Sequence, residues 1–237
     1  MERVKINCSI CKKEFEHPSD IKIPEPFICY DCQPAYLLER YKEFSNTNGA
    51  LEKIGVPKIF LNAHVDQFAP ERIQRLPDKI EAPGLLLTGE PSVGKSHLAA
   101  ALTRRELRHY IAMNNQKKPC GFSAKWANAH QLLMEIRHTF NRKDGYSEMD
   151  LVKAYVDYEY LVIDDLGTEK QSEWALTTLT NIVDGRMNLE KVTVITSNLS
   201  IVKLIEIDTR LAARLMAYTI VKFKGENKRK NEKIVDF

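Results

Sequence analysis

The sequence predicts an α/β fold in which a parallel sheet is flanked by helices, preceded by a small cysteine-rich module. Three observations support this prediction. A short apolar strand, residues 84–88, leads through a glycine-containing loop into a helix-forming segment. A second apolar run, residues 160–163, ends in the acidic pair Asp164 and Asp165, as expected of a strand buried on both faces. Four of the five cysteines lie within the first 33 residues.

The composition is that of a globular protein. The 237 residues are 43% hydrophobic and 28% charged, with a formal net charge of +3, which suits one main domain plus a small module. The first residues carry charges and no apolar run, so no signal peptide is expected, and no stretch approaches the length of a membrane span. We therefore expect a cytoplasmic protein with no membrane partner. The basic segment 222–233 could meet nucleic acid or be a solvated terminus.

The N-terminal cysteines form two Cys-x-x-Cys pairs, Cys8 with Cys11 and Cys29 with Cys32. Two such pairs at this separation match the four thiolates of one tetrahedral Zn²⁺, and disulfides are not expected in the cytoplasm. A segment this short buries little apolar surface, so zinc would supply most of its folding free energy. Residues 1–33 are therefore predicted to form a zinc ribbon, in which a closed ligand shell makes the metal structural.

Residues 34–53 carry apolar side chains at helical spacing and are expected to form a helical linker. The pattern is expected to break at residues 46–49, where Asn-Thr-Asn-Gly is a turn signal. The apolar stripe could pack on the larger domain or present a surface to a partner protein. Residues 54–237 are predicted to form the main domain.

The loop after the first strand has the pattern Gly-x-x-x-x-Gly-Lys-Ser. Its two glycines let the backbone approach phosphate oxygens that a Cβ would obstruct, and its N–H groups point at an anion together with the start of the next helix. Lys95 supplies a positive charge to the β and γ phosphates, and the Ser96 hydroxyl takes one position on Mg²⁺. The sequence therefore predicts a site for ATP and Mg²⁺. The predicted binding residues are Gly89, Glu90, Pro91, Ser92, Val93, Gly94, Lys95, Ser96 and His97.

The acidic pair is the second motif that P-loop ATPases require. The carboxyl ends of parallel strands are where ligands bind in open α/β sheets. Asp164 would hold Mg²⁺, directly or through water, and Asp165 would orient or deprotonate the attacking water. A surface acidic pair is the plain alternative. A third strand, residues 192–198, ends in Asn198, which is either a strand-end turn or a side chain that positions water against the γ phosphate.

Arg210 and Arg214 lie one helical turn apart, on one face of a predicted helix. Either arginine, donated to the nucleotide of a neighbouring subunit, would stabilise the charge of the transition state. A solvated helix face is the alternative.

With these residues, the chain resembles the AAA+ helicase loaders of the DnaC and DnaI type and the related IstB transposition ATPases. The resemblance runs from about residue 54 to about residue 229. Besides the phosphate-binding loop, it is carried by residues 56–68, 136–141, 161–167, 182–186 and 194–198. It implies an AAA+ ATPase whose partners are a DnaB-type replicative helicase and single-stranded DNA, and self-assembly, because an arginine finger acts across a subunit interface.

The resemblance also implies roles for individual residues. Asn198 looks like the sensor-1 residue and Arg214 like the arginine finger, with Arg210 a close competitor. Arg229 is the best candidate for a sensor-2 arginine, although the short C-terminus indicates a reduced or absent helical lid.

Phe140 and its basic neighbours Arg137, Arg142 and Lys143 resemble the single-strand DNA contact of the family. An aromatic ring that stacks on a base, beside charges that meet the phosphates, suits sequence-tolerant binding.

Two departures from the family pattern leave three hypotheses open. Asp165 stands where many AAA+ ATPases have Glu, so hydrolysis could be slow, and the zinc ribbon is closer to the DnaI type than to the DnaC type. The first hypothesis is a helicase loader whose N-terminal module, residues 1–50, grips the helicase. The second is an IstB-like helper that acts with a transposase on duplex DNA. The third is a nucleotide-dependent DNA-binding switch with negligible turnover.

Overall fold

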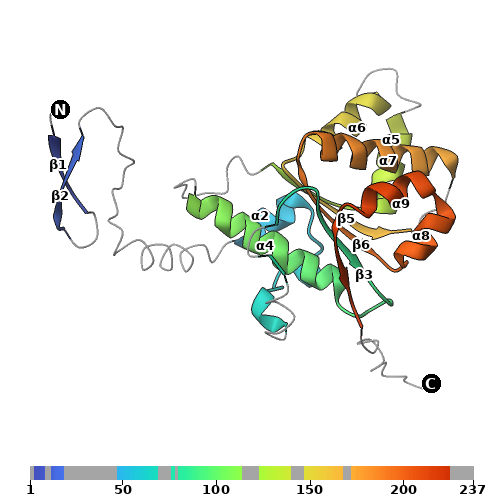
Figure 1. The fold of residues 1–237 in the computed structure, drawn as a ribbon, viewed down its shortest axis with the longest axis horizontal. Helices are drawn as coiled ribbons and strands as arrows, with labels where there is room; N and C mark the ends of the chain where they lie inside the picture. Colours follow the sequence, from blue (N-terminus) through green and yellow to red (C-terminus); the bar gives the residue numbers. More distant parts are fainter. Residues whose placement is uncertain are drawn as a thin grey trace.

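The computed structural model describes residues 3–8, 12–18, 47–68, 76–77, 80–113, 123–139, 147–167 and 172–224. Residues 47–224 of this set form an α/β domain around a five-stranded parallel sheet (Figure 1). None of the helices in the described ranges is long and apolar enough to span a membrane.

The sheet confirms the predicted α/β class. Its strand order is β4-β5-β6-β3-β7, and every neighbouring pair is parallel. Its strands are β3 (Gly84–Thr88), β4 (Ala124–Asn128), β5 (Tyr160–Leu166), β6 (Val192–Ser197) and β7 (Thr219–Lys222). Because parallel neighbours need crossover connections, every connection between these strands passes through at least one helix. All carboxyl ends meet at one edge of the sheet, where β3, β5 and β6 bring their following residues together.

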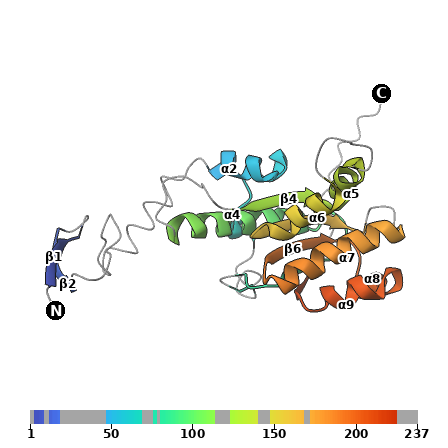
Figure 2. The same ribbon diagram turned by 90° about the horizontal axis from the view of Figure 1, so that it is seen from above.

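Helices cover both faces of the sheet (Figures 1 and 2). Leu85 and Leu87 of β3 pack into the cluster that contains α2 and α4, whereas Leu86 packs into the cluster of α5 to α9. This alternation follows from the two-residue period of a strand. The helices are α2 (Thr47–Ile54), α4 (Lys95–Met113), α5 (Ala129–His138), α6 (Glu148–Asp157), α7 (Glu173–Asn188), α8 (Ile201–Ile207) and α9 (Thr209–Leu215), with 3-10 turns η1 (Lys58–Phe60) and η2 (Val65–Gln67).

Local capping explains where several helices begin. The side chains of Asn128, Ser147, Ser172, Ser200 and Asp208 each accept a backbone N–H from the first turn of the helix that follows. These are the residue types that satisfy the unpaired N–H groups at a helix start. These caps therefore fix where the five helices begin.

The start of the α/β domain differs from the expectation. The predicted break at residues 46–49 is wrong, because α2 begins at Thr47 and runs through Gly49 to Ile54. Leu51 and Ile54 are buried in the core beside α4, and Arg104 of α4 donates to the Thr47 hydroxyl. The packed domain therefore includes residues 47–53, which the sequence pattern placed in the linker. The apolar stripe of residues 36–44 lies outside the described residues.

An antiparallel hairpin occupies the N-terminus, with β1 (Arg3–Asn7) paired to β2 (Glu14–Pro18). Cys8 follows β1 and is buried. The Cys8 carbonyl accepts from the Lys12 N–H at 3.0 Å, and Lys12 has a left-handed backbone with φ of 62°. Lys12, the residue that follows Cys11 in sequence, is therefore in contact with Cys8. Cys11, Cys29 and Cys32 lie outside the described residues, so the zinc ribbon stays a prediction.

Candidate functional site

The phosphate-binding loop connects β3 to α4, as the motif requires. Gly89 and Gly94 have φ of 147° and 104°, conformations that residues with a Cβ rarely adopt. A Cβ at Gly89 would meet the Phe223 carbonyl oxygen at 2.5 Å. Phe223 lies there because its N–H donates to the Thr88 carbonyl at 2.7 Å. The residue that follows β7 therefore packs directly against the loop.

Lys95 lies inside this loop with only 5% of its surface exposed. Its ammonium donates to the Gly89 and Glu90 carbonyls at 2.8 and 2.7 Å and to Asn198 Oδ1 at 2.8 Å. Burial lowers the pKa of Lys95, although nearby carboxylates, Asp165 foremost, act in the opposite direction. The fold thus brings Asn198 against a lysine 103 positions earlier in the chain.

Asp164 lies beside the start of α4. It is 7% exposed, and its Oδ1 accepts from the Ser96 hydroxyl at 2.8 Å and from the Thr196 hydroxyl at 2.6 Å. Burial raises the pKa of Asp164, while these two hydroxyl donors lower it. A hydroxyl and a carboxylate adjoining a phosphate-binding loop are the hard oxygen ligands that Mg²⁺ prefers. The residues present therefore fit a Mg²⁺ ion bound together with a nucleotide.

A β-bulge shapes the acidic pair. The pairing of β5 with β6 is regular through Ile163 and Ile195 but resumes at Leu166 and Ser197. Asp164 and Asp165 therefore face the single residue Thr196, and bulges of this kind change the direction of side chains next to active sites. Asp165 has φ of 60°, and its N–H donates to Thr196 Oγ1 at 2.9 Å. Thr196 was not among the site residues predicted from the sequence, although a polar residue near the end of an apolar strand is a usable signal.

His97, the last of the predicted loop residues, contacts Gln67 of η2 and Phe68. Its Nε2 lies 2.7 Å from Gln67 Oε1, and its ring meets Phe68 edge-on at a centroid distance of 5.4 Å. The described segment around η1 and η2 thus packs on the first turn of α4.

Both predicted finger arginines lie on α9. Arg214 forms a two-pronged ion pair with Asp184 of α7, at 3.0 and 3.1 Å, and this contact raises the pKa of Arg214. Arg210 lies 3.3 Å from Asp208 and is more exposed, at 61% of its side-chain surface against 35% for Arg214. Arg229 lies outside the described residues.

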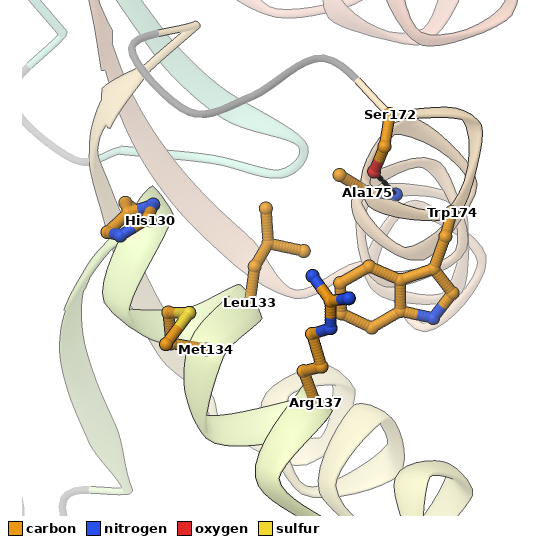
Figure 3. Close-up of a pocket in the computed structure, with 7 residues that line it drawn as sticks. All are labelled: His130, Leu133, Met134, Arg137, Ser172, Trp174 and Ala175. Carbon is orange, nitrogen blue, oxygen red and sulfur yellow. Dashed lines mark hydrogen bonds between the residues drawn. The ribbon is translucent and has the colours of Figure 1, made fainter. Parts of the chain in front are cut away.

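A groove of about 320 Å³ runs between α5 and the start of α7 (Figure 3). Leu133, Met134 and Trp174 give it apolar walls, and the predicted DNA contact Arg137 points into it from α5. The other lining residues are His130, Ser172 and Ala175.

The tryptophan of this groove is held in place, since Trp174 Nε1 donates to Glu148 Oε1 at 2.8 Å. Sequence reasoning missed Trp174 and Ser172, which lie 35 or more positions after Arg137 in the chain. The other predicted DNA contacts, Phe140, Arg142 and Lys143, lie outside the described residues.

The family described as IstB-like ATP binding protein matches residues 79–234 of this chain.

Curated relatives match a shorter stretch. Replicative helicase loader DnaC of Buchnera aphidicola subsp. Baizongia pistaciae (strain Bp) is 28% identical over 114 residues, which are 48% of this chain and 42% of the relative. Replicative helicase loader DnaC of Escherichia coli (strain K12) is 27% identical over 113 residues, 48% of this chain and 41% of the relative. The matches thus span about two fifths of the length of these relatives.

Solved structures share the fold. A crystal structure of the DnaC helicase loader aligns with a TM-score of 0.53 at 22% identity and covers 71% of this chain and 100% of its own. A DnaI structure aligns at 0.51 and 19% identity, over 74% of this chain and 95% of its own. Domain III of the Thermotoga maritima replication initiation protein DnaA aligns at 0.54 and 17% identity, over 69% of this chain and 67% of its own.

Proposed function

The chain belongs to the family of IstB-like ATP binding proteins and has the AAA+ P-loop fold, and from this premise we propose that it is an ATP-dependent loader of a DnaB-type replicative helicase. One observation carries the nucleotide part of this proposal. Lys95 and Ser96, neighbours at the phosphate-binding loop, bond to Asn198 and Asp164 respectively, so side chains from three separate parts of the chain gather in one cluster. The relatives named as replicative helicase loaders support the choice of partner.

In this proposal the cluster hydrolyses ATP. Lys95 exchanges its bonds to the loop carbonyls for the β and γ phosphates, and Ser96 and Asp164 hold Mg²⁺. Bound Mg²⁺ neutralises phosphate charge that develops in the transition state. Asp165 orients or deprotonates the attacking water, and Asn198 positions that water.

We assign Arg214 as the arginine finger toward a neighbouring subunit, with Arg210 as the competitor. Both Arg214 and Asp184 are partly exposed, so their ion pair can open at little cost. Arg214→Ala and Arg210→Ala are compared for turnover and nucleotide affinity. The finger variant should lose roughly 10³-fold or more in turnover with affinity retained, which is the usual worth of such an arginine. Equal, small losses in both variants would contradict the assignment.

The groove between α5 and α7 is proposed to bind single-stranded DNA. Its apolar walls suit the face of an unstacked base, and Arg137, which points into it, suits a phosphate. Phe140, Arg142 and Lys143 follow α5 in sequence and would extend the same contact. Trp174→Ala should weaken oligo(dT) binding by about 5- to 150-fold, the range of one base–aromatic stack. Arg137→Ala should reduce the slope of log binding constant against log salt concentration by about the contribution of one phosphate contact.

A pair of methionines provides the control for this groove. Met134 lines the groove, and Met216 is exposed directly after α9. Met134→Ala should weaken DNA binding, whereas Met216→Ala should leave it unchanged. If the two variants behave alike, DNA does not use the groove.

We also propose that Cys8, Cys11, Cys29 and Cys32 hold one structural Zn²⁺. The burial of Cys8 and the bond from the Lys12 N–H to the Cys8 carbonyl suit a metal-binding knuckle. The purified chain should contain one zinc per molecule by atomic absorption, and Cys8→Ser should lose it. A metal-free wild-type chain that keeps its stability would refute this proposal.

The experiment that tests the loader function is capture of the replicative helicase by the zinc-loaded chain, with and without ATP and single-stranded DNA. Capture that depends on nucleotide and is lost on deletion of residues 1–46 supports the proposal. The deletion ends before Thr47 because α2 packs in the core. The truncated protein must still bind nucleotide.

Capture of a transposase instead would favour an IstB-like transposition helper, which the family description makes the second candidate. DNA binding with no turnover would favour a switch.

A further inference from the structure

We propose that Thr196 is the positioning residue of the acidic pair, holding Asp164 and Asp165 in the arrangement that binding of Mg²⁺-nucleotide requires. This inference rests on the nucleotide site proposed above. It concerns a residue with no assigned role in that site, and it is carried by the bulge in β5 and by the bonds of one buried hydroxyl.

The bulge creates a problem that Thr196 solves. Two residues of β5 face one residue of β6, so the regular ladder of backbone hydrogen bonds is interrupted between Ile163 and Leu166. The Asp165 N–H donates instead to the Thr196 hydroxyl at 2.9 Å. Asp165 also has a left-handed backbone, which is unfavourable for a residue with a side chain and needs support from its surroundings. Thr196 supplies that support from the facing strand.

The direction of the bonds at Thr196 follows from its partners. An ionised carboxylate only accepts hydrogen bonds, and a backbone N–H only donates. The single hydroxyl proton therefore goes to Asp164 Oδ1 at 2.6 Å, and the oxygen accepts from Asp165. One side chain thus sets the carboxylate of Asp164 and the backbone of Asp165. Ser96 donates to the same Oδ1 at 2.8 Å, so the two predicted magnesium ligands meet where Thr196 holds the carboxylate.

Threonine suits this role better than valine or serine, the residue types that are similar to it in size. Thr196 is fully buried, and its β-branch restricts χ1, so the hydroxyl has a fixed direction. Valine has the same shape and lacks both bonds, whereas serine keeps the hydroxyl. The pair Thr196→Val and Thr196→Ser therefore separates positioning from packing.

A matched control lies on the same strand. Thr193 is also fully buried, and its hydroxyl accepts from Arg186 at 2.8 Å, near the opposite end of β6. Thr193→Val removes a buried hydroxyl and leaves the Arg186 donor without this partner, as Thr196→Val leaves the Asp165 N–H. It therefore reports the structural cost of such a change away from the acidic pair.

The test measures the dissociation constant of a non-hydrolysable ATP analogue with Mg²⁺ and with EDTA, on the full-length chain. Turnover and the thermal midpoint are recorded beside it. Mg²⁺ should raise the affinity of the wild type for the analogue. In Thr196→Val this gain should be smaller by a factor of about ten or more, which corresponds to the loss of a hydrogen bond to a charged group. Thr196→Ser should restore most of the gain, and Thr193→Val should keep it. If Thr196→Val does not fold, Thr196→Ala removes the same hydroxyl and carries the same expectation.

The outcomes separate this inference from the function on which it rests. A wild type that binds the analogue more tightly with Mg²⁺, together with an unchanged Thr196→Val variant, overturns the role of Thr196 alone. A gain lost equally in Thr193→Val also overturns it, because the effect is then structural. A wild type that does not bind the analogue overturns the proposed nucleotide site and this inference with it. If the wild type shows no turnover, the comparison of dissociation constants still decides between these outcomes.

Discussion

Replacing Lys95 with methionine should separate nucleotide binding from stability. Lys95 is nearly buried, and burial lowers its pKa, which means that the folded chain holds this charge at a cost. Methionine keeps the length of the side chain and removes the charge. The lost bonds go to Asn198 and to the carbonyls of Gly89 and Glu90, two residues that are not fully buried, so water can replace the ammonium there.

The two expected effects differ in size and sign. A charge-assisted hydrogen bond to phosphate is worth about 1.5–3 kcal/mol, so ATP affinity should fall by about 10- to 150-fold or more. The free energy of unfolding should stay within about 1 kcal/mol of the wild type or rise, because relief of the buried charge offsets the lost bonds. The lysine is thus expected to favour function at the expense of stability.

Isothermal titration with ATP and urea unfolding of both proteins test this prediction. The folded-state pKa of Lys95 is lowered, so the unfolded chain binds more protons between that value and the ordinary pKa of lysine. Wild-type stability should therefore rise relative to Lys95→Met as the pH increases through this alkaline range. Unchanged ATP affinity, or a loss of more than about 2 kcal/mol in stability, would refute the reasoning.

Three further substitutions probe the frame around the site. Gly89→Ala should lose about 1–3 kcal/mol of stability and most nucleotide affinity, because φ is 147° and the Cβ would meet the Phe223 carbonyl. Wild-type values of stability and nucleotide affinity, measured by calorimetry, would contradict this. Arg186→Met should cost about 3 kcal/mol in a urea melt, since it leaves one buried and two partly buried carbonyls without their donor, at about 1–3 kcal/mol for a fully buried group. Arg104→Met should speed amide exchange in residues 47–63, which Arg104 ties to α4; unaltered exchange there would show that packing alone holds the segment.

Helix and strand assignments were predicted well where the local pattern is strong. The strands expected at residues 84–88, 160–163 and 192–198 are observed at Gly84–Thr88, Tyr160–Leu166 and Val192–Ser197. The break expected at residues 46–49 failed, because Leu51 and Ile54 gain more from burial against α4 than the turn-forming residues lose in a helix.

By itself the sequence determined the chemistry available to this protein. The pattern from Gly89 to Ser96, the acidic pair after an apolar run, and Asn198 at the end of a β-branched strand are each local, so neighbouring residues suffice to identify them. The same holds for the four N-terminal cysteines, whose spacing predicts their metal.

Only the tertiary structure decided how these pieces meet. The contact of Lys95 with Asn198, the bulge that sets Thr196 against Asp164, and the groove that joins Arg137 to Trp174 all link distant parts of the chain. Such contacts depend on strand order and on which residues of neighbouring strands face each other. In a parallel sheet both follow from crossovers and packing on two faces, which no local pattern encodes.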